Sequence, residues 1–326
     1  MKVDRRDFLK VLSAGAVTAA VPDNVFARAK KDVSSEAVGI LYDSTLCIGC
    51  KTCEMACQNY NKLFSQPSDK SNTDFDPYNF ALNKIQIYRD GDGIDKESNG
   101  KKNKDGKESK DGYSFFKKAC MHCVDPNCVS ACPASALTKD EKSGIVSWNS
   151  DACIGCRYCQ VACPYLIPKF EYDAAFPEII KCEMCQHVQA KGKIPGCCDF
   201  CPTGAAVFGK FSDILKEAKN RLTLPEKSNY KYPVGDLTGK RSKNNPVKKY
   251  INYVYGEKEG GGTQYLILSA VPFENLGLPK LPDYSNASKT EGLQHTLYKG
   301  MIAPIALFAG LAFTTYKAAK AEDKGE

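Results

Sequence analysis

The apolar and polar positions of this chain alternate mostly in short runs, which predict strands and few long helices. Residues 84–88 alternate as a half-buried strand does, and residues 113–116 are its expected partner in a hairpin. Short runs at 145–148 and 265–271 predict two more strands. Helical spacing behind N-cap chemistry predicts one packing helix over 212–222. The pattern therefore favours an α+β chain built from small elements.

Long polar stretches separate these runs. Residues 89–112 are rich in Gly, Lys and Asp and have almost no apolar residue, which predicts a solvated loop. Residues 224–262 are turn-rich and polar, and we expect them to wrap a neighbour or the outer part of the fold. Residues 272–297 have the composition of an extended linker. The compact part of the chain is therefore expected over residues 40–271.

The first residues of the chain have the composition of an export signal. Arg5 and Arg6 are followed by a weakly hydrophobic run over 11–21, and small residues end the segment near Ala29. A charged start, a short apolar core and an A-x-A-like end predict a secretory signal, and the arginine pair indicates the twin-arginine route. We therefore expect a twin-arginine signal peptide over residues 1–29. The alternative is an amphipathic N-terminal helix.

The C-terminal region contains one uncharged run, residues 301–316, bracketed by Lys299 and Lys317. Sixteen residues at about 1.5 Å rise cover about 24 Å, which is short of the hydrocarbon core of about 30 Å. Flanking lysines and tyrosines extend that reach. The sequence predicts a transmembrane anchor over 298–317 in the lipid bilayer, followed by a cytoplasmic tail over 318–326. A buried core helix is the alternative.

The cysteine content is the feature of the composition that indicates the class of protein. The 45 Lys and Arg residues against 38 Asp and Glu leave a net charge of +7, which argues only weakly for an anionic partner and not for nucleic acid. The 17 cysteines all lie between Cys47 and Cys201. The sequence contains no Ser–His–Asp set, P-loop or dinucleotide fingerprint. The concentrated cysteines therefore indicate either a disulfide framework or metal ligands.

Sixteen cysteines follow one repeated template. The four groups are Cys47, Cys50, Cys53 and Cys57; Cys120, Cys123, Cys128 and Cys132; Cys153, Cys156, Cys159 and Cys163; and Cys182, Cys185, Cys197 and Cys201. In ferredoxins, three closely spaced cysteines hold one [4Fe–4S] cluster, and the fourth holds the other cluster of the pair. Disulfides would be irregularly spaced, and zinc would take isolated C-x2-C pairs. The groups therefore predict four [4Fe–4S] clusters. Because no catalytic constellation accompanies them, we expect a chain that transfers electrons and is not itself catalytic.

A local exchange of the fourth cysteine pairs the second and third groups, and the first and fourth groups then pair across the chain, which gives four ligand sets for iron. They are Cys47, Cys50, Cys53 and Cys201 (cluster 1); Cys57, Cys182, Cys185 and Cys197 (cluster 2); Cys120, Cys123, Cys128 and Cys163 (cluster 3); and Cys132, Cys153, Cys156 and Cys159 (cluster 4). This pairing inserts one ferredoxin-like lobe, about 116–166, into another. Cys197 is preferred to Cys198 because it keeps the three-residue step to Cys201, but the choice stays open.

The chain resembles the four-cluster ferredoxin-type electron-transfer subunits of membrane-bound respiratory oxidoreductases. Within them it is most similar to the iron–sulfur subunit of periplasmic, quinone-linked nickel–iron hydrogenases of the hydrogenase-2 type. The resemblance is carried by the stretches LYDSTLCIGC, CMHCVDPNCVSACP, ACIGCRYCQVACPY, YGEKEGGGTQ and QHTLYKG. The cysteine motifs alone specify the superfamily, and the two C-terminal stretches are more selective.

The resemblance implies a relay on the periplasmic face of the inner membrane. A hydrogenase small subunit, and through it the large subunit, would exchange electrons with the lobe of clusters 1 and 2. The inserted lobe would face an integral membrane subunit that reacts with quinone.

Two alternative functions stay open. The first is the β subunit of a respiratory formate dehydrogenase or of another molybdenum oxidoreductase. The second is a non-redox metal-binding or disulfide-rich exported protein.

Overall fold

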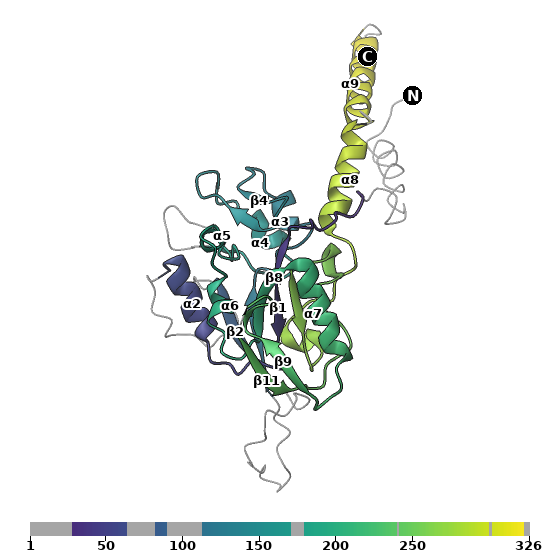
Figure 1. The fold of residues 1–326 in the computed structure, drawn as a ribbon. Coiled ribbons are helices and arrows are strands. Elements are labelled where there is room, and N and C mark those ends of the chain that lie inside the picture. Colours follow the sequence, from purple (N-terminus) through teal and green to yellow (C-terminus); the bar gives the residue numbers. More distant parts are fainter. Residues whose placement is uncertain are drawn as a thin grey trace, which may run out of the picture. The chain divides into compact units, whose positions relative to one another are not determined.

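The computed structural model describes residues 28–63, 82–89, 113–170, 179–239, 241–299 and 302–322 (Figure 1). Most of the predicted signal peptide and nearly all of the predicted 89–112 loop lie outside these residues. The chain divides into two units, one formed by residues Lys30–Ser285 and one by Met1–Ala29 with Asn286–Glu326. Each unit is described by itself.

A mixed four-stranded sheet forms the centre of the larger unit. Its order is β10 (Gly235–Asp236), β8 (Ala206–Lys210), β1 (Val38–Asp43) and β12 (Tyr265–Leu268) (Figure 1). β1 pairs antiparallel with β8 and parallel with β12, so that Ile40 lies opposite both Phe208 and Tyr265. The predicted strand at 265–271 is therefore confirmed, although it ends at Leu268. The Ser269 side chain there bonds to the backbone of Val271.

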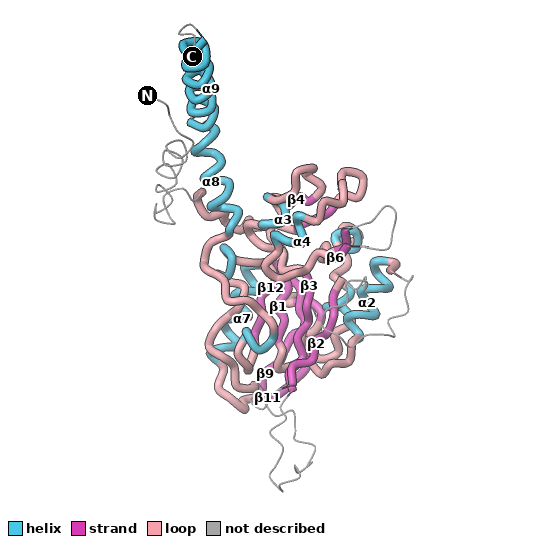
Figure 2. The backbone as a smooth tube through the Cα atoms, turned by 180° about the vertical axis from the view of Figure 1, so that it is seen from behind, coloured by secondary structure: helices cyan, strands magenta, loops and turns pink. Residues whose placement is uncertain are grey.

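The sheet is buried on both faces, and the alternation along β1 shows how. Ile40 and Tyr42 belong to the main hydrophobic core, while Leu41 belongs to a second core beneath α7 (Phe211–Thr223). Successive side chains of a strand point to opposite faces, so one strand serves both cores. The helix predicted over 212–222 is thus confirmed, and α7 lies along the sheet (Figures 1 and 2).

Two-stranded hairpins surround the sheet. They are β2 (Asn83–Arg89) with β3 (Tyr113–Ala119), β4 (Leu137–Lys139) with β5 (Val146–Trp148), β6 (Lys169–Phe170) with β7 (Ile179–Ile180), and β9 (Asn229–Pro233) with β11 (Ser242–Pro246). The first confirms the hairpin expected from 84–88 and 113–116, with Gln86 opposite Phe116. β5 confirms the strand expected at 145–148.

Short helices lie within the cysteine groups or directly after one of their cysteines. They are α2 (Thr52–Asn61), α3 (Asn127–Ser130), α4 (Tyr158–Ala162), α5 (Gln186–Gln189) and α6 (Gly196–Asp199). A third core, which includes Leu137, Val146 and Ile179, packs beside α3 and α4. Helix and strand content is therefore mixed, as the α+β prediction required.

Two segments expected to be irregular contain regular structure. The stretch 224–262 includes the β9–β11 hairpin and the 3-10 turn η2 (Glu259–Gly261). The stretch 272–297, which was expected to be an extended linker, is not extended throughout. It contains η3 (Phe273–Leu276) and most of α8 (Asn286–Lys299). Its prolines all precede residue 283, so nothing interrupts the helix after that point.

The uncharged C-terminal run does form a helix, α9 (Ile302–Glu322). Its last turns carry Lys317, Lys320 and Glu322, so the apolar run stays at sixteen residues or about 24 Å. Within the part of the chain that the structure describes, no helix combines the length and the apolar character needed to cross a membrane. The transmembrane anchor predicted over 298–317 is therefore not found.

Candidate metal-cluster sites

The four cysteine groups share one local backbone conformation. The residue before the second cysteine of each group has a positive φ: 70° at Gly49, 44° at His122, 67° at Gly155 and 51° at Met184. This left-handed turn bends each loop back on itself. At Gly49 a Cβ atom would lie 2.3 Å from the Phe115 ring, so only glycine fits there. The repeat inferred from spacing is thus also a repeat in structure.

One cavity is lined by Cys47, Cys50, Cys53 and Cys201, which are the four cysteines of predicted cluster 1. The first three come from the loop that leads into α2, and Cys201 comes from the turn between α6 and β8. Residues almost 150 positions apart in sequence are thus brought to one site. Pairing of the first and fourth groups across the chain explains this arrangement.

A second cavity is lined by the cysteines predicted for cluster 4, namely Cys132, Cys153, Cys156 and Cys159. Its walls also include Trp148 of β5 and Ile179 of β7. Cys132 comes from the second group and the others from the third, as local exchange between neighbouring groups requires.

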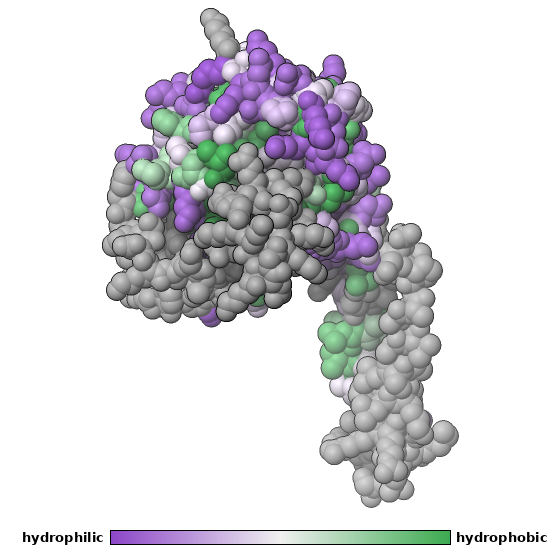
Figure 3. Space-filling model, turned by 90° about the horizontal axis from the view of Figure 1, so that it is seen from below, coloured by the Kyte–Doolittle hydropathy of each residue, from purple (hydrophilic) through white to green (hydrophobic). Residues whose placement is uncertain are grey.

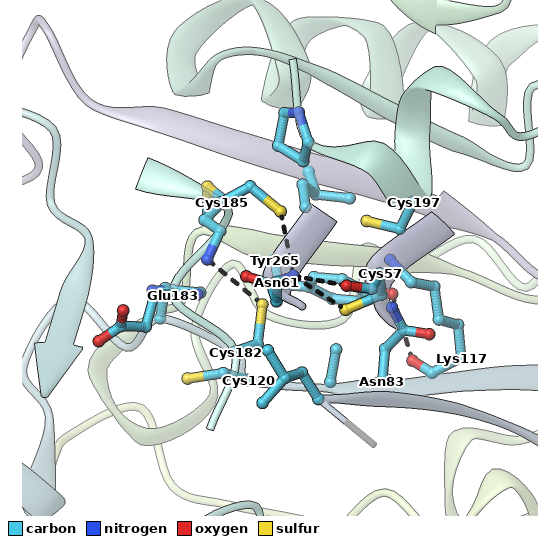
Figure 4. Close-up of a pocket in the computed structure, with 16 residues that line it drawn as sticks. Cys57, Asn61, Asn83, Lys117, Cys120, Cys182, Glu183, Cys185, Cys197 and Tyr265 are labelled. Atoms are coloured by element: carbon cyan, nitrogen blue, oxygen red, sulfur yellow. Dashed lines mark hydrogen bonds between the residues drawn. The ribbon is translucent and has the colours of Figure 1, made fainter. Parts of the chain in front are cut away.

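A third cavity is lined by the cysteines predicted for cluster 2, namely Cys57, Cys182, Cys185 and Cys197, together with Cys120. In Figure 4 the labelled sulfur atoms of Cys57, Cys182, Cys185 and Cys197 surround the same space. Cys120 belongs to the predicted cluster 3 set, so its presence in this wall brings the third set close to the second.

The remaining set, predicted for cluster 3, is gathered around Cys123. Burial raises the pKa of the Cys123 thiol, and the nearby Cys120, Cys163 and Cys128 thiolates raise it further. All four cysteines of the set therefore lie within electrostatic reach of one another. The structure thus brings together each of the four predicted sets.

Burial dominates the electrostatics of these thiols. It raises the pKa of Cys53, Cys128 and Cys182 to about 12 each, and neighbouring thiolates contribute to all three shifts. Several thiolates crowded in a low-dielectric site need a positively charged group to hold their negative charge. Iron supplies that charge in an iron–sulfur cluster. The donor set therefore fits [4Fe–4S] clusters.

Hydrogen-bond donors already point at some of these sulfur atoms. The backbone N–H of Met184 donates to Cys182 Sγ at 3.3 Å, and that of Ala136 donates to Cys132 Sγ at 3.2 Å. Asn61 Nδ2 donates to Cys57 Sγ at 3.5 Å. Donors of this kind hold the ligands in place and tune the cluster potential.

Two further N–H donors are buried in the cavity walls without a partner among the described residues: His122 Nε2 and Trp148 Nε1. His122 Nδ1 accepts a hydrogen bond from the backbone N–H of Val146 at 3.1 Å. Burial, together with the Lys181 and Lys139 ammonium groups, lowers the pKa of His122, so the ring is neutral and Nε2 carries the proton. An unpartnered buried donor costs stability unless a bound group accepts its hydrogen. The sulfur atoms of a cluster are such acceptors.

Cys197 and Cys198 occupy different environments. Cys197 lines the cavity with Cys57, Cys182 and Cys185, whereas Cys198 is fully buried and does not line it. The two sulfur atoms are 4.0 Å apart. A hydrogen bond from Cys198 and the ammonium group of Lys117 lower the pKa of Cys197 to about 5. This geometry favours Cys197 as the ligand and Cys198 as a donor to it.

Among the described residues, no three Cys, His, Asp or Glu side chains converge tightly enough to hold one metal ion. The ligands of a four-iron cluster bind four different irons, so they surround a volume and not a point. Sequence reasoning missed Trp148, Asn61 and Lys117 as parts of these sites. Nothing in a strand sequence separates Lys117, which lines two cavities, from its half-exposed neighbour Lys118.

His122→Phe is expected to lower the midpoint potential of one cluster while leaving the iron content unchanged. A hydrogen bond to a sulfur atom stabilises the reduced cluster by about 1 kcal/mol. Its loss therefore lowers the one-electron midpoint potential by roughly 40 mV. A redox titration followed by electron paramagnetic resonance measures the shift. Val188→Phe changes a buried apolar residue on α5 and serves as the packing control. Equal shifts in both variants would contradict a donor role for His122.

Comparison with known proteins agrees with this interpretation of the site. The family model described as "4Fe-4S dicluster domain" matches residues 112–211. The chain is 46% identical over 319 residues to the hydrogenase-2 operon protein HybA of Escherichia coli O157:H7, covering 95% of this chain and 94% of that one. It is 28% identical over 322 residues to the iron–sulfur subunit of the nitrate-inducible formate dehydrogenase of Escherichia coli (strain K12), covering 96% and 93%. It is also 31% identical over 236 residues to the protein NrfC of the same strain, covering 72% and 92%.

Fold and site together define a ferredoxin-like protein that carries [4Fe–4S] clusters and transfers electrons. Within that class the chain belongs to the family of the hydrogenase-2 operon protein HybA. It is therefore an iron–sulfur electron-transfer subunit of hydrogenase-2 type and not itself a catalytic subunit.

Proposed function

We propose that the chain holds four [4Fe–4S] clusters in a single relay between a hydrogenase and a quinone-reactive membrane subunit. The ligands are the four predicted cysteine sets, with Cys197 and not Cys198 in the second set. The observation that carries this proposal is that three cavities are each lined by one complete set. Each cluster, when bound, accepts and gives up one electron.

The order of the relay is cluster 1, 2, 3, 4, and electrostatic interactions between neighbouring sets support it. Cys53 of set 1 and Cys197 of set 2 influence each other electrostatically. Cys182 of set 2 is similarly close to Cys120 of set 3. Cys128 of set 3 is influenced by Cys159 of set 4. Each set thus has a neighbour in the next, which a continuous relay requires.

The two ends of this order carry exposed apolar side chains, which supports partner contacts there. Ile48 and Met55 beside cluster 1 are 55% and 64% exposed, and Ile154 and Val161 beside cluster 4 are 69% and 83% exposed. Most of the described surface in Figure 3 is hydrophilic, with hydrophobic residues gathered in patches. We assign the cluster 1 end to the hydrogenase small subunit and the cluster 4 end to the integral membrane subunit.

We also propose that the chain works on the periplasmic side of the inner membrane after twin-arginine export. The signal is assigned to residues 1–29 and the four-cluster domain to 40–271, with its inserted lobe at about 116–166. The twin-arginine route carries folded proteins, which suits clusters built before export. Exposed apolar residues of α9, including Leu307, Phe308 and Leu311, support a contact with the membrane subunit.

Anaerobic affinity purification from detergent-solubilised membranes tests this function, with iron and other metals assayed on one sample. We expect about sixteen irons per chain, as four four-iron clusters require, together with nickel and hydrogen-dependent dye reduction. The same iron with molybdenum or tungsten and no nickel would indicate the formate dehydrogenase relay instead. Absence of iron from an anaerobic sample would overturn the cluster assignment.

A further inference from the structure

Lys117 is a lysine in the interior of the larger unit. It lies near the end of β3, three residues before Cys120, and its side chain is 1% exposed. No carboxylate of the described residues lies within ion-pair distance of its ammonium group. A buried charge without a carboxylate partner is costly, and such a residue is rarely found without a compensating group.

The position of Lys117 shows which groups compensate its positive charge. It lines the cavity of Cys47, Cys50, Cys53 and Cys201, and it also lines the cavity of Cys57, Cys182, Cys185 and Cys197. In Figure 4 it lies at the side of the latter cavity near Cys57 and Cys197. Lys117 therefore stands in the wall shared by the sites of clusters 1 and 2.

Two features of the surroundings suit an ammonium group in this position. Its Nζ atom lies 5.3 Å from the centre of the Tyr265 ring, a cation–π distance. The same side chain lines the cavity that contains Cys53 of set 1 and the cavity that contains Cys197 of set 2. Lys117 therefore lies between cysteine ligands of two sets.

We propose that Lys117 is a positioning residue for electron transfer, whose ammonium group is the shared counter-charge of clusters 1 and 2. This inference rests on the proposed function. Reduction adds one negative charge to a cluster, and a nearby positive charge favours that state. Lys117 therefore raises the potentials of both clusters together.

The shared position also matters for the transfer step itself. When both clusters are bound, an electron passing between them would leave the first oxidised and the second reduced. The negative charge would then move from one side of the ammonium group to the other and stay compensated throughout. A counter-charge beside only one cluster would instead favour the electron on that cluster and widen the difference between the two potentials.

The test is a redox titration of the purified complex with the variants Lys117→Met and Lys117→Arg, followed by electron paramagnetic resonance. Methionine keeps the size and apolar stem of lysine but removes the charge. We expect Lys117→Met to make reduction of two clusters at least tenfold less favourable, which is a fall of about 59 mV for each. Lys117→Arg, which keeps the charge, is expected to restore most of the shift.

Lys118→Met is the matched control, because Lys118 is the next residue of β3 and lines neither cavity. It is expected to leave all potentials unchanged. Unchanged potentials in Lys117→Met, a shift of only one cluster, or an equal shift in Lys118→Met would each overturn the inference. Loss of iron from both Lys117 variants would also overturn it, because the residue would then be needed to build the sites. The iron content and the electron paramagnetic resonance signals of the unmodified complex test the proposed function separately from this inference.

Discussion

Cys197→Ala is expected to remove one cluster and to stop electron flow through the chain. Cys197 lines the cavity with Cys57, Cys182 and Cys185, whereas the adjacent Cys198 does not line it. Iron is expected to fall from about sixteen to about twelve per chain, since one four-iron cluster is lost. Because this cluster is second in the proposed order, hydrogen-dependent reduction of quinone should fall to background while hydrogenase activity with dyes persists.

The control for this result is the adjacent thiol, Cys198, which is also buried but does not line the cavity. Cys198→Ala is expected to keep all the iron and most of the electron flow. Removal of its hydrogen bond to Cys197 should lower the potential of the same cluster, because a donor to a ligand sulfur favours the reduced state. Iron loss from Cys198→Ala with full iron in Cys197→Ala would reverse the ligand assignment.

Arg221→Met is expected to give the largest loss of stability of any single change outside the cysteines. The Arg221 side chain is fully buried and pairs with Asp43 Oδ2 at 3.1 Å and with Glu217 Oε1 at 2.8 Å. Its guanidinium also lies over the Tyr232 ring, 5.0 Å from the centre. Removing one partner of a buried ion pair leaves an uncompensated charge, here that of Asp43, at a cost of about 3–5 kcal/mol.

Thermal unfolding of the anaerobic complex measures this effect, with release of the clusters as the readout. A loss of that size should lower the unfolding temperature by roughly 10 °C in a domain of this length. The same helix provides a control, since Lys219 on α7 pairs with Glu257 at 2.6 Å but is 54% exposed. Lys219→Ala should cost less than about 1 kcal/mol. A double change, Arg221→Met with Asp43→Asn, should recover part of the loss, and failure to do so would argue against the ion pair as its cause.

Local features of this protein follow from the sequence by itself. The spacing of three cysteines within seven residues already implies a tight loop, and the structure adds that His122 and Met184 take the same left-handed turn as Gly49 and Gly155. The β2–β3 hairpin and α7 were also predicted, because each has a strong apolar pattern of its own. Such features depend on neighbours a few residues away, so a single sequence carries them.

Features that depend on distant contacts could not be predicted in this way. Lys117 and Lys118 are adjacent lysines of one strand, and only the packing of β3 against Tyr42 and Tyr265 of the sheet buries one of them beside two ligand sets. The same holds for Cys197 and Cys198, whose roles depend on which sulfur faces the cavity. The strand β12 joins β1 in parallel across more than 220 residues of chain. Burial, charge compensation and strand pairing of this kind arise from residues far apart in sequence, so only the tertiary structure determines them.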